Sequence, residues 1–251
     1  MKAMIFAAGL GTRLKPLTDT MPKALVPLAG KTLLQWQIER LKAAKITDIV
    51  VNVHHFPDMI INYLRTNNYF GCNIAVSDER DTLLETGGGL CKAKELLLGD
   101  EAILVCNVDI LSNIDIPTLL DAYDPQGMGV VVVSARKTQR YLLFDEDDRL
   151  CGWTNIATGE VRGEEAIRRL GVEPVTIKKL AFSGMQVLNP RIFDYMDAVI
   201  EKKGNKFSLI DLYLSIAEKE ILKAFIPENY RMIDVGKINQ LSEAEAFAQE
   251  L

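Results

Sequence analysis

The chain of 251 residues is predicted to form an α/β fold, a Rossmann-like sheet that is mixed but mostly parallel and is flanked by helices on both faces. Three observations predict this class. Short apolar runs alternate with amphipathic helical patterns through the first half of the chain. The first apolar run leads directly into a glycine-rich loop. The composition, with 48% hydrophobic and 25% charged residues, is that of an ordinary globular protein.

The first half of the chain supplies apolar strand patterns with helices between them. Strands are expected at residues 3–8, 48–53, 73–76, 102–106 and 128–135. Helices are expected at residues 32–45, from residue 57, at residues 88–98 and from a cap at residue 115. Because neighbouring parallel strands need a crossover connection, this alternation predicts the parallel part of the sheet.

The second half is expected to depart from this alternation. Residues 140–153 resemble a hairpin that turns at four acidic residues, and the segment up to residue 179 is charged and poor in large apolar side chains. We interpret residues 140–180 as an excursion from the sheet on the substrate side. Strands then follow at residues 180–188, 221–226 and 231–234, with helices at residues 190–202, 208–220 and from 238. No linker marks a boundary, so residues 1–251 are expected to form a single domain.

Charge and cysteine usage exclude several classes. The formal net charge is −5, whereas nonspecific binding of nucleic acid requires a basic face, so no nucleic-acid partner is expected. The four cysteines contain no Cys-x-x-Cys pair, and the two histidines are adjacent, so neither a zinc site nor a disulfide framework is predicted. The sequence has no signal-peptide pattern and no apolar run long enough to span a membrane, which predicts a cytoplasmic protein.

The loop Gly9-Leu10-Gly11-Thr12-Arg13-Leu14 is the clearest functional signal. Its glycines allow successive main-chain N–H groups to point into one cavity, which suits a phosphate. A dinucleotide fingerprint would need a third glycine where Leu14 stands, and a Walker A loop would need Gly-Lys-Ser/Thr. Two glycines alone also fit an ordinary turn. The next segment, Pro22-Lys23-Ala24-Leu25-Val26-Pro27, holds a lysine between prolines.

Residues 7–30 together resemble the signature of the sugar-1-phosphate nucleotidyltransferases, Ala-Ala-Gly-x-Gly-Thr-Arg-Leu followed by Pro-Lys-x-Leu-x-Pro. Leu-Glu-Thr-Gly-Gly-Gly at residues 84–89, Phe-Ser-Gly at 182–184 and Ile-Asp-Val-Gly at 233–236 follow in the expected order. Within the family the set is most similar to the uridylyltransferases that act on N-acetylmuramate 1-phosphate. Mannose-1-phosphate guanylyltransferases are similar around residues 51–55. The resemblance covers nearly the whole chain except residues 145–179, and it implies the nucleotide-diphospho-sugar transferase type of fold.

The resemblance implies transfer of a nucleoside monophosphate from a nucleoside triphosphate, UTP being favoured, to a sugar 1-phosphate. Both reactants are polyanions, so the site needs cations and aimed hydrogen-bond donors. Arg13, Lys23 and Asp109 match the catalytic residues of the family. The residues that match its nucleotide-binding positions are Ala8, Gly9, Gly11, Thr12, Arg13, Lys23, Glu85, Thr86, Gly87 and Gly88.

A magnesium ion is the cofactor that the resemblance implies, with Asp109 and Asp234 as its ligands. Asp109 also follows an apolar strand, where ligand sites of α/β proteins form, and hard carboxylate oxygens suit magnesium. The chain departs from the family pattern at Val108, where a small residue is usual, and this side chain either points into the sheet or narrows the nucleotide pocket.

The acceptor site is the least specified. Gly184 resembles the glycine against which the sugar lies, and Asn155 and Lys206 are candidates for contacts with the sugar or its phosphate. If the sugar carries a lactyl carboxylate, as N-acetylmuramate does, Arg140 and Lys179 are the candidate cations for it. His54 and His55 are interpreted as packing residues. The alternatives are another sugar 1-phosphate such as that of mannose, glucose or a heptose, cytidylyl transfer to phosphocholine, for which Trp153 and Tyr141 could form an aromatic cage, and a non-catalytic nucleotide-sugar sensor. The chain is expected to be a monomer or a homodimer.

Overall fold

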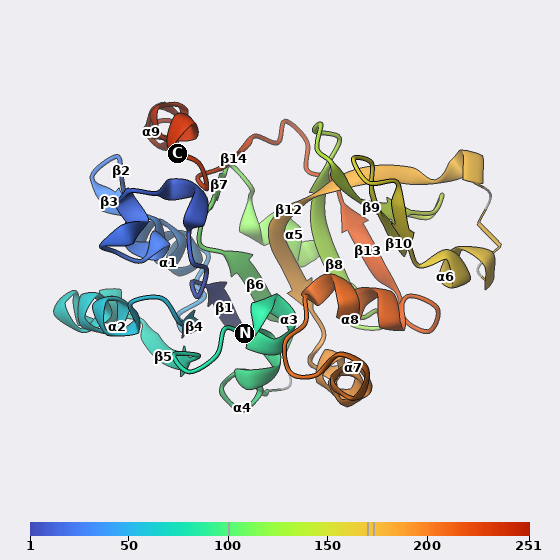
Figure 1. Ribbon diagram of the computed structural model, residues 1–251, viewed down its shortest axis with the longest axis horizontal. Coiled ribbons are helices and arrows are strands. Elements are labelled where there is room, and N and C mark those ends of the chain that lie inside the picture. Colours follow the sequence, from blue (N-terminus) through green and yellow to red (C-terminus); the bar gives the residue numbers. More distant parts are fainter. Residues whose placement is uncertain (100, 170, 173) are drawn as a thin grey trace.

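The computed structural model describes residues 1–99, 101–169, 171–172 and 174–251. Parallel strands form the centre of its main sheet, and each lies within two residues of the strand predicted from the sequence. They are β1 (Lys2–Phe6), β4 (Asp48–Val53), β5 (Asn73–Asp78) and β6 (Ile103–Asn107). β1 pairs with β4 and β6, and β4 pairs with β5, so the carboxyl ends of these strands lie along one edge (Figure 1).

Antiparallel strands continue the sheet, which makes it mixed as predicted. β12 (Lys178–Leu188) is antiparallel to β6 through residues 185–188. β8 (Gly129–Ser134) is antiparallel to β12, and β13 (Leu222–Phe225) is parallel to β8. β12 therefore joins the parallel centre to the second half of the chain.

The prediction that residues 140–180 leave the sheet is wrong for the parts that form strands. β9 (Arg140–Phe144), β10 (Leu150–Asn155) and β11 (Glu160–Arg162) extend it in the order β11-β10-β9-β12-β6-β1-β4-β5, and α6 (Glu164–Arg169) follows. The hairpin between β9 and β10 was predicted correctly. Leu142, Phe144 and Leu150 are buried in the core, whereas the charged residues that follow them obscured this pattern.

Helices cover both faces of the sheet, as predicted. Side chains alternate along β1, so Ala3 and Ile5 face one core and Met4 and Phe6 the other. The first core is covered by α1 (Leu33–Ala43), α2 (Pro57–Thr66), α5 (Ile116–Asp121) and α9 (Leu241–Ala248). The second is covered by α3 (Glu85–Lys92), α4 (Lys94–Leu97), α7 (Met196–Lys203) and α8 (Leu209–Ile216).

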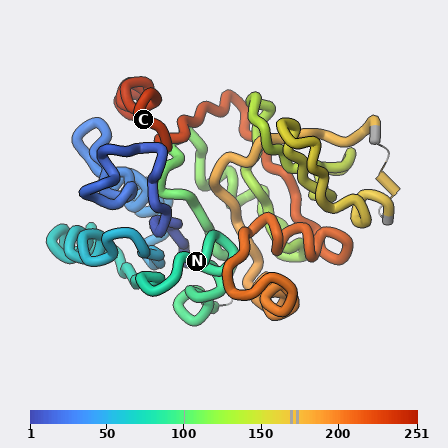
Figure 2. The backbone as a smooth tube through the Cα atoms, viewed as in Figure 1, coloured from blue at the N-terminus to red at the C-terminus, as the bar shows by residue number. Residues whose placement is uncertain are grey.

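Two small ribbons complete the fold. β2 (Pro27–Leu28) pairs with β3 (Lys31–Thr32), and β7 (Ile110–Ser112) pairs with β14 (Met232–Asp234). The last helix, α9, returns to lie beside the N-terminal part of the chain (Figure 2). None of the helices in the described part of the chain has the length and apolar character needed to cross a membrane.

Candidate active site

A cavity of about 340 Å³ opens at the carboxyl edge of the parallel strands. Its walls are the loop after β1, the residues after β6 and the first turn of α3, and its lining includes Ala7, Ala8, Gly9, Lys23, Asn52, Glu85, Thr86, Asn107, Val108 and Asp109. This size and this position at a sheet edge are typical of small-molecule sites in α/β proteins. Val108 is 4% exposed and packs into the core while it lines the cavity, so its side chain forms part of the wall.

The glycine loop is shaped to receive an anion. Gly11 has a φ of +64°, and a Cβ at this position would lie 2.8 Å from Thr18 Cγ2, so only glycine fits. The Thr18 hydroxyl donates to the Gly11 carbonyl at 2.9 Å and holds the turn. Within the described residues, the main-chain N–H groups of residues 8–11 donate no hydrogen bond. They are therefore available to phosphate oxygens.

Lys23 and Asp109 form an ion pair on the wall of the cavity. Pro22 precedes the short 3₁₀ turn that carries Lys23, and Lys23 is 8% exposed. Its Nζ donates to Asp109 Oδ2. Because both side chains are largely shielded from water, the Coulomb attraction between them is screened less than in a surface salt bridge.

Arg13 and Asp234 form a second ion pair, which lies outside the residues that line the cavity. Arg13 Nη2 lies 3.5 Å from Asp234 Oδ2, and the Arg13 side chain is 54% exposed. Gly236 packs against both, since a Cβ there would lie 2.5 Å from Asp234 Oδ1 and 2.7 Å from Arg13 Nη2. The β7–β14 ribbon joins the two pairs, because the Val235 N–H donates to the Asp109 carbonyl at 2.8 Å.

Asp234 keeps one carboxylate oxygen without a partner among the described residues. Asp234 Oδ1 is buried and has no hydrogen-bond partner in the described part of the chain, which is unusual for a carboxylate oxygen. No group of three or more His, Cys, Asp or Glu residues that could hold a metal occurs among the described residues. Magnesium commonly takes one or two carboxylates and completes its shell with phosphate oxygens and water, so this donor set suits an ion that arrives with a nucleotide.

The first turn of α3 is seated on the segment that leads into α8. The N–H groups of Gly87 and Gly88 both donate to the Phe207 carbonyl, at 2.9 and 3.1 Å, and Thr86 Oγ1 accepts from the Leu209 N–H at 2.9 Å. A Cβ on Gly88 would lie 2.1 Å from the Asn205 carbonyl oxygen. These glycines are thus required by close packing, and Thr86 is held where it lines the cavity.

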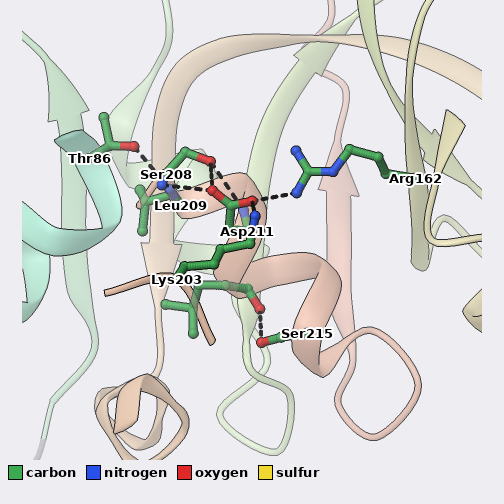
Figure 3. A network of polar contacts seen from close by, with 8 residues as sticks. Thr86, Arg162, Lys203, Ser208, Leu209, Asp211 and Ser215 are labelled. Carbon is green, nitrogen blue, oxygen red and sulfur yellow. Dashed lines mark hydrogen bonds and ion pairs between the residues drawn. The ribbon is translucent and has the colours of Figure 1, made fainter. Parts of the chain in front are cut away.

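A network of polar contacts holds the segment at the start of α8 against which the first turn of α3 packs (Figure 3). Ser208 and Asp211 form a capping box at the start of α8. Asp211 Oδ1 also accepts from Lys203 Nζ at 2.7 Å and from Arg162 of β11. Burial alone would raise the pKa of Asp211, but the hydrogen bonds from Lys203, Ser208 and Arg162 outweigh it and hold the pKa well below its usual range.

Comparison with known proteins agrees with this geometry. A family model described as "Nucleotidyl transferase" matches residues 2–250. The chain belongs to the nucleotidyl transferase family. The N-acetylmuramate alpha-1-phosphate uridylyltransferase of Caulobacter vibrioides is 34% identical over 99% of this chain and 97% of its own length. The protein of the same name from Neisseria meningitidis serogroup B is 48% identical over 46% of this chain and 49% of its own length.

The fold is shared with solved nucleotidyltransferases. The structure of UDP-glucose pyrophosphorylase in complex with UDP-glucose matches this chain with a TM-score of 0.74 at 18% identity, covering 100% of this chain and 99% of that chain. The family and the fold type predicted from the sequence are therefore confirmed.

The acceptor candidates of this nucleotidyltransferase fall into two groups. Gly184 lies beside the cavity with a φ of +75°, and a Cβ there would lie 2.5 Å from Ile110 Cγ1. Arg140 and Asn155 are neighbours on β9 and β10, and Lys206 is exposed between α7 and α8. These three, like the exposed Lys179 of β12, lie outside the lining of the cavity.

Sequence reasoning missed Asn52, a buried polar residue that lines the nucleotidyltransferase cavity, and Glu79, the buried residue to which it is hydrogen-bonded. Asn52 Oδ1 accepts from the Ala7 N–H at 2.7 Å, and its Nδ2 donates to Glu79 Oε1 at 2.7 Å. An asparagine within the apolar strand β4 was the available signal. His54 Nδ1 contacts the Glu79 carbonyl at 2.7 Å, so this histidine has a structural hydrogen bond.

Proposed function

We propose that this nucleotidyltransferase transfers the uridylyl group of UTP to N-acetylmuramate 1-phosphate and releases pyrophosphate. The observation that carries the proposal is the pairing of Lys23 with Asp109 and of Arg13 with Asp234 beside a loop of unpaired main-chain N–H groups. Such an array of donors and cations suits a triphosphate. The names of the two uridylyltransferase relatives support the choice of nucleotide and sugar.

The reaction would proceed by direct attack of one phosphate on another. An oxygen of the sugar 1-phosphate attacks the α-phosphorus of the nucleotide, and the bond from that phosphorus to the leaving pyrophosphate breaks. The attacking oxygen is already anionic, so no general base is required. Lys23 holds charge close to the α-phosphorus, where it stabilises the transition state. Arg13, which is more exposed, can turn its planar guanidinium to the β- and γ-phosphates.

Magnesium would be held by Asp109 and Asp234 and would neutralise charge that develops on the phosphates. Both aspartates also orient the cationic side chains, since Lys23 and Arg13 lie against them. Glu85, Thr86, Ala8 and Gly9 would surround the nucleoside, because they line the same cavity. In this proposal residues 1–251 act as one catalytic domain in the cytoplasm.

The acceptor would lie close to Asp109, beside the residues at the end of β6. Gly184 is proposed to contact the sugar, because it packs against these residues. Arg140, Asn155 and Lys206 are proposed as outer contacts, and the β9–β11 part of the sheet as the substrate side. A cation among them would balance the lactyl carboxylate of N-acetylmuramate.

The test is pyrophosphate release by the purified protein with magnesium. UTP, GTP, dTTP and CTP are each combined with the 1-phosphates of N-acetylmuramate, mannose and glucose and with phosphocholine. Release above background with UTP and N-acetylmuramate 1-phosphate supports the proposal. Release with another pair names a different acceptor or base, and nucleotide binding without any release indicates a sensor.

A further inference from the structure

Glu79 is a buried carboxylate that takes no part in the chemistry above. It follows β5, is 0% exposed, and makes no ion pair among the described residues. Burial raises the pKa of its side chain above the usual range. A carboxylate in such a place is costly unless hydrogen bonds compensate for lost water, so its partners reveal its purpose.

Those partners connect two separate walls of the cavity. Glu79 Oε1 accepts from Asn52 Nδ2 at 2.7 Å, and Oε2 accepts from the Leu84 N–H at 3.2 Å. Asn52 in turn accepts from the Ala7 N–H at 2.7 Å. The chain of hydrogen bonds therefore runs from Ala7, at the root of the glycine loop, to Leu84, just before the first turn of α3.

The surroundings are built to accommodate this carboxylate. A Cβ on Gly89 would lie 2.7 Å from Glu79 Oε1 and 3.0 Å from Asn52 Nδ2, so the helix has no side chain where it crosses the network. Glu85, next to Leu84, has a φ of +61°, which is strained for a residue other than glycine. The hydrogen bond from the Leu84 N–H to Glu79 fixes the main chain directly before the strained residue Glu85.

We propose that Glu79 is a positioning residue for nucleotide binding, which holds the loop after β1 and the first turn of α3 at a fixed separation. This inference rests on the proposed function only in taking the cavity as the nucleotide site. The role needs a carboxylate because both partners are donors. A glutamine of the same shape offers one acceptor and one donor, so one of the two links becomes a contact between donors.

The test compares Glu79→Gln with Asp78→Asn, which makes the same chemical change one residue earlier. Asp78 is a matched control because its carboxylate pairs with Arg80 at the surface. Hydrogen–deuterium exchange of the free proteins is followed in the segments 7–9 and 83–86, where the amides of Ala7 and Leu84 are the reporters because they donate to the network. In Glu79→Gln we expect protection of both segments to fall by about tenfold, while β1 and β6 stay protected as in the wild type. Asp78→Asn should leave both segments unchanged.

Kinetics supply the second readout. With the productive substrate pair, Glu79→Gln should raise KM for the nucleoside triphosphate about tenfold and leave kcat within about twofold, since the group acts on binding and not on the reacting atoms. Exchange that rises in one segment only, or uniformly across the sheet, would overturn the proposal. So would an unchanged KM accompanied by a lower melting temperature. Absence of turnover in the wild type would refute the proposed function, while the exchange comparison would still decide the role of Glu79.

Discussion

Alanine in place of Gly236 would put a methyl group between the side chains of Arg13 and Asp234. The Cβ would lie 2.5 Å from Asp234 Oδ1 and 2.7 Å from Arg13 Nη2. Non-bonded heavy atoms prefer about 3.5–4 Å, so both groups must move by roughly 1 Å. A misplacement of about 1 Å at a reacting site costs on the order of 100-fold in rate. The expected loss in kcat/KM is therefore equivalent to about 2.7 kcal/mol of transition-state stabilisation.

The stability of the Gly236→Ala protein should not fall with its activity. The obstructing atoms are the ends of flexible side chains, and Gly236 does not have a positive φ, so alanine can adopt its backbone conformation. Such a replacement usually stabilises a protein by about 0.4–1 kcal/mol through the unfolded chain. For a chain of this size the Tm should stay constant or rise by about 1–4 °C. Gly99→Ala is the matched control, because a Cβ there meets nothing within 4 Å.

Two measurements on each variant separate the possibilities. Pyrophosphate release gives kcat/KM, and thermal unfolding gives the Tm. The account predicts that Gly236→Ala loses activity about 100-fold with no loss of Tm, and that Gly99→Ala matches the wild type in both. Full activity in Gly236→Ala would refute the placement of Arg13 and Asp234 in the site. A loss of Tm that accompanies the loss of activity would show that Gly236 acts in packing and not specifically on the two side chains.

Three other variants test separate parts of the account. Lys23→Met should lower kcat by at least about 100-fold with a modest change in KM, and a change in KM alone would make Lys23 a binding group only. Asp211→Asn should lower the free energy of unfolding by about 2 kcal/mol at neutral pH. Folding lowers the pKa of Asp211, so the ionised side chain stabilises the fold fully above the ordinary carboxyl pKa and loses this effect as pH falls through the folded pKa. The difference in free energy of unfolding between variant and wild type should therefore shrink in acid. A difference that does not change with pH would contradict this. Gly88→Ala should cost about 2–3 kcal/mol in urea unfolding, because the Asn205 carbonyl is a backbone atom that cannot easily move, and an unchanged midpoint would contradict the seating of α3.

Much of the parallel centre could be predicted because its signals are local. The apolar run at residues 48–53 became β4 with the same limits, and Asp115 caps α5 as expected. The strand at residues 231–234 was predicted, but its pairing with β7 was not, since the pairing joins two strands of three residues from distant parts of the chain. The extension of the sheet by β9–β11 was missed because a charged stretch follows its buried residues, and charge alone does not show which backbone groups are paired.

The candidate site, like the fold, could be predicted only in part from the sequence. The resemblance identified Arg13, Lys23, Asp109 and Asp234, and the structure brings them together as two ion pairs. It matched Gly87 and Gly88 to nucleotide-binding positions, but it did not show their close packing, because the segment they pack against lies more than a hundred residues further along the chain. Glu79 stands in a polar stretch that resembles an exposed loop, so its burial was visible only in three dimensions.

The most direct test of the central claim is to identify the product formed under competition. The protein is incubated with magnesium, N-acetylmuramate 1-phosphate and equal concentrations of UTP, GTP, dTTP and CTP, and the nucleotide sugars are resolved by mass spectrometry, with Lys23→Met as the control. The account predicts that UDP-N-acetylmuramate is the main product and that the variant forms it at least about 100-fold more slowly. A different nucleotide sugar as the main product would contradict it. So would the absence of any product from N-acetylmuramate 1-phosphate when the protein converts mannose 1-phosphate and GTP in a separate reaction.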